Sequence, residues 1–205
     1  LGLAQPGPQR PPGWTTELHP EQAPWLVEAA AGLAAGQLLV VDYAHEAWRY
    51  YAPQRSNGTL MAYRRQQACD NPLLEPGHWD LTAHLCLETL ISAAEASGWS
   101  ALGQRRQGEA LLALGLAQRL HGLQQAPRAT AAADGLHRQA DAAHLEADLS
   151  ELLRRREALL RLVDPTALGD FRWIAFQRRS AEALASGDSP ARARLPLFLQ
   201  DPPLS

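Results

Sequence analysis

Acidic, phenolic, imidazole and hydroxyl side chains gather in two short stretches of this sequence. "VVDYAH" ends an apolar run and contains Asp42, Tyr43 and His45; "DLTAH" contains Asp80, Thr82 and His84. A carboxylate can orient a nitrogen-bearing group through its N–H donors, and an imidazole can accept a proton from it. Both stretches are therefore candidates for a site that binds a ligand and takes part in its chemistry.

Each stretch also has a structural interpretation, which stays open. Asp42 can cap the turn after a strand while Tyr43 packs, and His45 is expected to be a solvated loop residue. Asp80 or Thr82 can cap a helix, since an acid in the first turn complements the helix dipole and a hydroxyl accepts hydrogen bonds from free amides. A single histidine on a helix, such as His84, is more often structural than catalytic.

A third group of residues interleaves guanidinium groups with aromatic rings between these two stretches. Its members are Arg49, Tyr50, Tyr51, Arg55, Tyr63, Arg64 and Arg65. They could hold an acidic partner or a nucleic acid through charge and stacking. The alternative, which we favour slightly, is a solvated loop whose aromatic rings cover the core. Gly58, beside Thr59, is expected to serve backbone conformation.

The composition limits the classes of protein to consider. With 205 residues, of which 46% are hydrophobic, the chain can form one large domain or two small ones and bury a core. No stretch approaches the ~18 to 20 uninterrupted apolar residues of a membrane span. The formal net charge of −3 argues against a general nucleic-acid binder, because such proteins concentrate basic charge.

Residue types that are missing exclude further chemistry. The chain has no lysine, which removes Schiff-base chemistry and a phosphate-binding loop of the Walker type. Cys69 and Cys86 form no CxxC pattern, so neither a zinc site nor a disulfide framework is expected, and reduced thiols are the default. The only methionine is Met61, and we expect the chain to be a processed product or a piece of something longer.

Helices and strands alternate along the chain and must position the candidate residues. The expected elements are a helix ending at 36, a buried strand at 38–41 covered on both faces, a helix from 80 to 98, a weak strand at 99–106, helices at 107–125 and 136–163, and a strand at 171–176. A long excursion, with a hairpin turning at Asn57-Gly58, separates the first strand from the helix that follows it.

This order predicts an α/β architecture divided into three segments. These are an irregular lead-in at 1–20, an α/β domain at 21–180 and a Pro-rich tail at 181–205. Three strands make a poor stand-alone sheet, and no GxGxxG or Walker pattern occurs. The chain is therefore expected to be the second half of a doubly wound domain.

Five segments together resemble a known family. They are "LLVVDYAH", "RYYAPQRSNGTLMAYRRQ", "DNPLLEPGHWDLTAHL", "QGEALLALGL" and "DPTALGDFRWIAF". In this order and spacing the chain resembles, from about Pro20 to Arg179, the C-terminal half of the MidA-type S-adenosylmethionine-dependent methyltransferases. That family includes the mitochondrial complex I assembly methyltransferase.

The resemblance implies a partial Rossmann-like class I methyltransferase sheet with added helices. Residues 38–42, 100–106 and 171–177 would be its fifth, sixth and seventh strands, with a crossover helix beginning near Asp80. The family's cofactor half, with its glycine-rich loop, has no counterpart here. The chain also departs from the family at Ala44, where a glycine is usual, at Cys86, where an acid is usual, and at Gln66 or Gln67, where a histidine is usual.

The resemblance further implies S-adenosylmethionine as cofactor and a link to methylation of a protein arginine. The catalytic residues would be Asp42, Asp80 and His84; the substrate-binding residues would be Tyr43, Tyr51, Arg55, Thr59, Arg64 and Thr82. The implied partners are a protein substrate, of the kind found in a respiratory complex, and either a second copy or a complementing N-terminal half. Apart from the resemblance, the Arg-only basic set and the richness in Ala and Leu indicate a bacterial source, and the reduced thiols indicate a cytoplasmic protein.

Two other functions stay open. The chain could be a non-catalytic interaction or assembly module that keeps the family's substrate-facing surface, a reading motivated by the missing glycine-rich loop and by Ala44 and Cys86. It could also bind nucleic acid through its Arg and Tyr side chains, which would make binding sensitive to salt.

Overall fold

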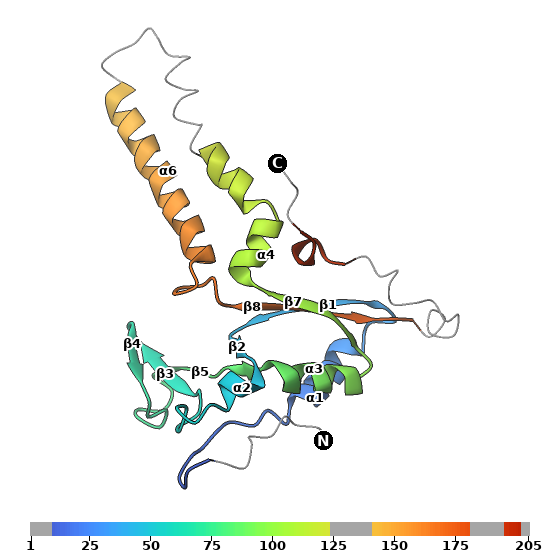
Figure 1. Cartoon of the computed structure of the whole chain (residues 1–205). Helices are drawn as coiled ribbons and strands as arrows, with labels where there is room; N and C mark the ends of the chain where they lie inside the picture. The colour runs from blue at the N-terminus through green and yellow to red at the C-terminus, as the bar shows by residue number, and fades with distance from the viewer. Residues whose placement is uncertain (1–9, 124–140, 181–194, 202–205) are drawn as a thin grey trace. The chain divides into compact units, whose positions relative to one another are not determined.

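The computed structural model describes residues 10–123, 141–180 and 195–201 (Figure 1). The chain separates into two compact units, and the separation passes through two strands. Unit 1 comprises Leu1–Gly103 with Ile174–Ala193, and unit 2 comprises Gln104–Trp173 with Arg194–Ser205. The division into lead-in, α/β domain and tail stays a prediction.

Among the described residues, the main sheet has three strands in the order β1-β8-β7. These are β1 (Gly36–Asp42), β8 (Arg172–Arg178) and β7 (Ser100–Arg106). All three predicted strands are confirmed to within two residues. The last of these three strands along the chain, β8, thus lies between the other two, and β1 is at an edge of this sheet in the described part of the chain.

The side chains of β1 alternate between two environments. Leu38 and Val40 pack against the core, whereas Leu39 and Val41 are 47% and 43% exposed. Successive side chains of a strand point to opposite faces, so one face of β1 is buried and the other is open. The prediction of a strand covered on both faces is therefore wrong for the described residues.

The core of unit 1 is formed by two helices packed on the sheet. They are α1 (Gln22–Ala30) and α3 (Leu87–Ala96). Trp99, which is 2% exposed, donates its indole N–H to the carbonyl of Leu26 at 3.0 Å and so ties the end of α3 to α1.

Both predicted boundaries of these helices need correction. α1 ends at Ala30 rather than near Gly36, because Leu33 N–H bonds to Ala30 in a tight turn and Gly36 already begins β1. α3 begins at Leu87 rather than near Asp80, because the residues before it form strands. Gly98, with φ of 82°, is confirmed as the terminator of α3.

The excursion between β1 and α3 is built of short elements. They are β2 (Ala44–His45), α2 (Ala47–Tyr50), β3 (Met61–Arg64), β4 (Gln67–Cys69), β5 (Asp80–Thr82) and β6 (Leu85–Cys86). β3 pairs with both β4 and β5 in an antiparallel sheet, and β2 pairs with β6 in parallel.

The hairpin in this excursion turns at a different place from the one predicted. β3 and β4 are joined at Arg65 and Gln66, whose φ angles of 48° and 66° suit a two-residue hairpin turn. Gly58 instead makes a separate turn with φ of 76°, so its expected backbone role is confirmed but the hairpin at Asn57-Gly58 is wrong.

The described part of unit 2 is largely helical. It contains α4 (Gln107–Ala113), a further helical segment at 116–123, α6 (Asp141–Val163) and the short 3-10 helix η2 (Leu197–Leu199). The predicted start of the long helix, at 136, lies outside the described residues. On α6, Arg155 pairs with Glu151 at 2.8 Å and Arg161 with Glu157 at 2.9 Å.

Gln107 holds the turn that follows α6. Its Nε2 donates to the carbonyls of Leu162 at 3.1 Å and Leu168 at 3.0 Å, and its Oε1 accepts from Trp173 Nε1 at 3.2 Å. Gly108 lies on α4, and a Cβ at this position would lie 2.9 Å from the carbonyl oxygen of Val163, the last residue of α6. Glycine at position 108 therefore allows the end of α6 to approach α4. The Gln107-Gly108 pair therefore packs unit 2 together.

Replacing Gln107 with leucine should lower the free energy of unfolding by roughly 2 kcal/mol, because two carbonyls and an indole N–H lose their partner. Urea denaturation followed by circular dichroism measures this loss. Gln118→Leu, at an exposed position of the adjacent helical segment, is the control and should leave the midpoint nearly unchanged. Equal midpoints for the two variants would contradict the role of Gln107.

Candidate functional site

The two candidate stretches of the sequence meet at the carboxyl end of β1. Asp42 ends this strand, and its Oδ1 accepts a hydrogen bond from the N–H of Tyr43 at 2.7 Å. The N–H of Leu85 donates to the carbonyl of Tyr43 at 2.8 Å, which begins the β2–β6 pairing. As a result the rings of Tyr43 and His84 lie 5.6 Å apart.

His45 and His84 form a stacked pair of imidazoles. Their ring centroids are 4.4 Å apart and their planes differ by 16°. His45 is only 5% exposed, so its prediction as a solvated loop residue is wrong: the pairing of β2 with β6 buries it. Arg55 donates from Nη2 to His45 Nε2 at 2.9 Å, which makes this nitrogen an acceptor and the His45 ring neutral.

His84 is held in its neutral form. Burial lowers its pKa below the usual value, and the positive charges of Arg55 and Arg49 lower it further, against weaker opposing effects of Asp42 and Glu17. Its Nδ1 atom is buried and has no hydrogen-bond partner in the described part of the protein. At neutral pH the ring is therefore uncharged, which is the form that can accept a proton.

Glu17 ties the segment before α1 to this site. Its carboxylate accepts hydrogen bonds from the N–H of Thr59, at 2.9 and 3.0 Å from its two oxygens, from the Thr59 hydroxyl at 3.0 Å and from the N–H of Leu60 at 2.9 Å. The Thr59 hydroxyl oxygen in turn accepts from the N–H of His84 at 3.0 Å. Glu17 thus reaches His84 through one intervening side chain.

Hydrogen bonding also sets the charge of Glu17. Burial raises the pKa of this carboxyl, but the bonds from Thr59 and Leu60 outweigh burial and lower the pKa below its usual value. A Cβ on Gly58 would collide with the Glu17 carboxylate, so the glycine also allows the carboxylate to approach the turn.

His19 and Tyr50 make a second connection to the site. His19 Nε2 donates to the carbonyl of His84 at 3.1 Å and lies 3.1 Å from the hydroxyl of Tyr50. Tyr50 is fully buried, and burial together with the charge of Glu17 raises the pKa of its phenol. Glu17 and His19 lie in the segment predicted to be an irregular lead-in, and no spacing in the sequence marks them.

The predicted substrate-binding residues divide between two places. Tyr43, Arg55 and Thr59 belong to the contacts around His84. Tyr51 is 4% exposed and packs against Tyr50, with ring centroids 4.9 Å apart, so it supports the site from within the core.

Arg64, Asp80 and Thr82 lie instead on the three-stranded sheet of the excursion. Arg64 pairs with Glu75 and lies 5.7 Å from the ring centroid of Trp79. Asp80 and Thr82 pair with Tyr63 and Met61 across β5 and β3, so their interpretation as helix caps is wrong. Their catalytic and binding roles stay predictions.

The interleaved Arg and Tyr residues also separate in the fold. Tyr50 and Tyr51 are buried, as expected for rings that cover the core, whereas Tyr63 on β3 is 42% exposed. Only part of this group therefore presents a surface to a partner.

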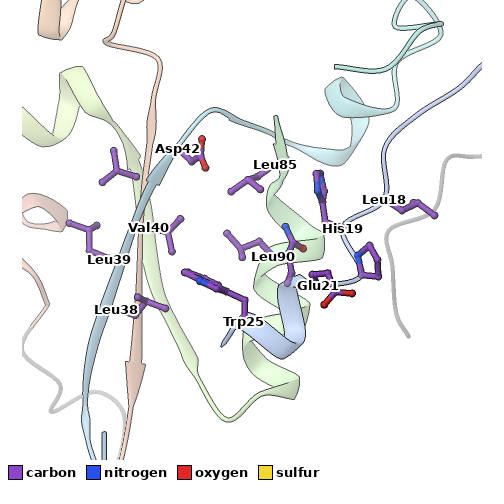
Figure 2. A pocket seen from close by; sticks show the side chains of 13 residues that line it. Leu18, His19, Glu21, Trp25, Leu38, Leu39, Val40, Asp42, Leu85 and Leu90 are labelled. Atoms are coloured by element: carbon purple, nitrogen blue, oxygen red, sulfur yellow. The ribbon is translucent and has the colours of Figure 1, made fainter. Parts of the chain in front are cut away.

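A pocket of about 680 Å³ lies beside β1 and reaches Asp42 (Figure 2). Its walls are mostly apolar, with Trp25 opposite Leu38 and Val40, and its polar side chains are His19, Glu21, Gln22 and Asp42. S-adenosylmethionine carries a carboxylate that needs N–H donors, typically from a glycine-rich turn. The residues that line this pocket do not include such a glycine-rich turn. They therefore do not by themselves fit the carboxylate of the cofactor.

Two negative findings apply to the described residues. Among them, no helix has the length and apolarity needed to cross a membrane. Within the same ranges, no three His, Cys, Asp or Glu side chains are grouped so that they could hold a metal ion.

Comparison with known proteins agrees with this α/β fold. Residues 2–105 match the family described as "Putative S-adenosyl-L-methionine-dependent methyltransferase". Because the match covers half of the chain, the chain belongs to this methyltransferase family. A search of curated proteins found no match.

Two solved structures from Burkholderia thailandensis are similar to the chain. One is a COG1565 superfamily member bound to S-adenosyl-homocysteine, with 27% identity and a TM-score of 0.67 over 90% of this chain. The other is a native structure of a COG1565 superfamily protein, with 27% identity and a TM-score of 0.62 over 80% of this chain. The chain spans only 43% and 38% of the lengths of these two proteins.

Proposed function

We propose that this chain forms the acceptor side of an S-adenosylmethionine-dependent methyltransferase and binds a protein arginine as the methyl acceptor. The observation that carries the proposal is the meeting of Asp42, Tyr43 and neutral His84 at the carboxyl end of β1. Ligands of open α/β sheets bind at this end of the strands. The family match supports the methyl-transfer class, and the resemblance to the MidA-type proteins supports arginine.

The chemistry of the acceptor fits the three side chains. A guanidinium remains charged at neutral pH, so a carboxylate such as Asp42 would orient it rather than deprotonate it. The ring of Tyr43, 40% exposed, offers a face for stacking. Methylation of a guanidinium nitrogen releases one proton, and His84 is uncharged and able to accept it.

The proposal further places the main sheet of this chain within a Rossmann-like class I methyltransferase sheet, as its C-terminal half. The lengths of the two solved relatives support a partial sheet, since each extends well beyond the part that the chain covers, and the resemblance to the MidA-type proteins supports the C-terminal half. Bound S-adenosylmethionine would supply an electrophilic methyl group, and the residues described here would serve the acceptor.

The test measures methyl transfer directly. The chain is incubated with methyl-tritiated S-adenosylmethionine and a bacterial protein extract, both alone and after co-expression with the part of the B. thailandensis relative that it does not cover. We expect label in methylarginine after protein hydrolysis. Asp42→Asn should lower this label at least 10-fold, because the guanidinium loses its carboxylate partner.

Asp70→Asn provides a matched control, since it makes the same change at an exposed position and should leave the label unchanged. Label in other amino acids would contradict the choice of arginine. No label under either condition would instead favour a non-catalytic assembly module, the second candidate, which the departures from the family at Ala44 and Cys86 support.

A further inference from the structure

The stack of His45 on His84 begins with the pairing of β2 and β6. Ala44 and His45 face Leu85 and Cys86 across this parallel pair, and His84 directly precedes β6. The pairing brings the two backbones together, but each ring can still rotate about two side-chain torsions. Rings that lie 4.4 Å apart with planes only 16° different therefore indicate a further contact that fixes their orientation.

Arg55 supplies that contact on the His45 side. Its Nη2 donates to His45 Nε2 at 2.9 Å, and its Nε donates to the carbonyl of Arg49 at 3.0 Å. Two bonds from one planar guanidinium leave it a single orientation. A guanidinium cannot accept a hydrogen bond, so His45 Nε2 is the acceptor and the proton of the neutral ring lies on Nδ1. Arg55 thus sets both the direction and the tautomer of the His45 ring.

We propose that Arg55 is a positioning residue for methyl transfer, which acts through His45 to hold the His84 ring in the orientation that receives the proton of the acceptor. This role rests on the proposed function, in which His84 accepts that proton. The resemblance implies that Arg55 binds the substrate, but two of its three nitrogens already bond to groups within unit 1. A neutral His45 offers His84 a flat face without charge, so the stack does not oppose a proton that arrives on His84.

Charged and titratable groups surround His84 on several elements. They are Asp42 and Tyr43 at the end of β1, His45 on β2, Arg49 on α2, Arg55 after it, and Glu17 and His19 before α1. Burial lowers the pKa of His84 most, and Arg55 has the largest effect among the charges, ahead of Arg49. A ring with a lowered pKa readily gives up a proton once it has received one. Arg55 therefore both orients His84 and favours its return to the neutral form.

Imidazole NMR of the chain labelled with ¹⁵N-histidine tests this positioning without methyl transfer. In the wild type, His45 should carry its proton on Nδ1, and the ring protons of His45 and His84 should be shifted upfield by the stack. Arg55→Met should remove both signatures and raise the pKa of His84, because a donor and a charge are lost. Arg55→Lys keeps a charged donor and should retain most of them. A wild-type proton on His45 Nε2, or unchanged ring shifts in Arg55→Met, would overturn the proposal.

A double-mutant cycle with His45→Phe shows whether Arg55 acts through His45. Phenylalanine keeps a flat ring but offers no acceptor, so Arg55→Met in this background should leave the ring-proton shifts of His84 unchanged at pH 8. Equal effects of Arg55→Met with and without the His45 imidazole would contradict the proposal. Arg119→Met, the same change at an exposed position of unit 2, is the control and should leave the His84 signals as they are.

The methyl-transfer assay separates positioning from substrate binding. Arg55→Met should lower the label in methylarginine roughly 10-fold, Arg55→Lys should restore most of it, and more extract should not rescue Arg55→Met. Rescue by excess extract would assign Arg55 to substrate binding and overturn the proposal. Absence of label in the wild type, with the NMR signatures present, would overturn the proposed function while leaving Arg55 as the residue that orients the two imidazoles.

Discussion

Replacing Glu17 with alanine should destabilise unit 1 by roughly 3 kcal/mol, because the amides of Thr59 and Leu60 and the Thr59 hydroxyl lose a charged acceptor in a half-buried place. Chemical denaturation followed by tryptophan fluorescence measures the change. Glu28→Ala, at an exposed position of α1, is the matched control and should change stability by less than about 0.5 kcal/mol.

The same carboxylate should make stability depend on pH. Since the pKa of Glu17 is lowered in the folded state, the unfolded chain binds more protons around its ordinary pKa of 4.5. The contribution of Glu17 is therefore fully present above pH 4.5 and is lost as the pH falls below it. The stability difference between the wild type and Glu17→Gln should shrink between pH 6 and pH 3. A constant difference over this range would contradict the role of the charge.

The pKa of His84 shows whether Glu17 acts on the candidate site as well as on the stability of unit 1. The charge of Glu17 opposes the lowering of the His84 pKa, so Glu17→Gln should shift that pKa further down. Titration of the imidazole signals by NMR measures the shift. Unchanged His84 titration in a folded Glu17→Gln protein would show that Glu17 stabilises the turn at Thr59 without influencing the site.

Replacing Trp99 with alanine should cost roughly 4 kcal/mol, as expected for a large aromatic side chain removed from a packed core. Trp99 is 2% exposed and belongs to the cluster that joins α1, α3 and β8. Thermal unfolding followed by circular dichroism measures the loss.

Two further variants divide the effect of Trp99 into its parts. Trp99→Phe keeps most of the ring but leaves the carbonyl of Leu26 without its donor, so a loss of roughly 1 to 2 kcal/mol is expected. Trp48→Ala removes the same side chain at a position that is 75% exposed and should change stability little. Equal losses for Trp48→Ala and Trp99→Ala would contradict the assignment of the core.

The strands of the main sheet could be predicted because their signals are local. The apolar, β-branched run before Asp42 and the aromatic run around Trp173 both lie in observed strands. The exposure of Leu39 and Val41 could not be predicted in this way, because a short apolar run does not show whether both faces of its strand are covered.

The residues of the candidate site could be predicted only where a reactive side chain stands at the end of a helix or strand. Asp42 ends a strand and Tyr43 follows it, which marks both in the sequence, whereas His84 is marked only by its place beside Asp80 and Thr82. Glu17 and His19 could not be predicted, and the burial of His45 could not either, because their contacts depend on the pairing of β2 with β6 and on the turn at Thr59. The caps assigned to Asp80 and Thr82 fit helix chemistry, but strand pairing with β3 overrode that local preference.

The bonds that hold unit 1 together join residues far apart in the chain. Glu17 and Thr59 are separated by 42 positions, His19 and His84 by 65, and Leu26 and Trp99 by 73. Closing such large loops costs conformational entropy before these bonds form, so refolding on the order of milliseconds to seconds is expected. During that interval the exposed apolar side chains of β1, Leu39 and Val41, can contact other chains, which favours aggregation during synthesis.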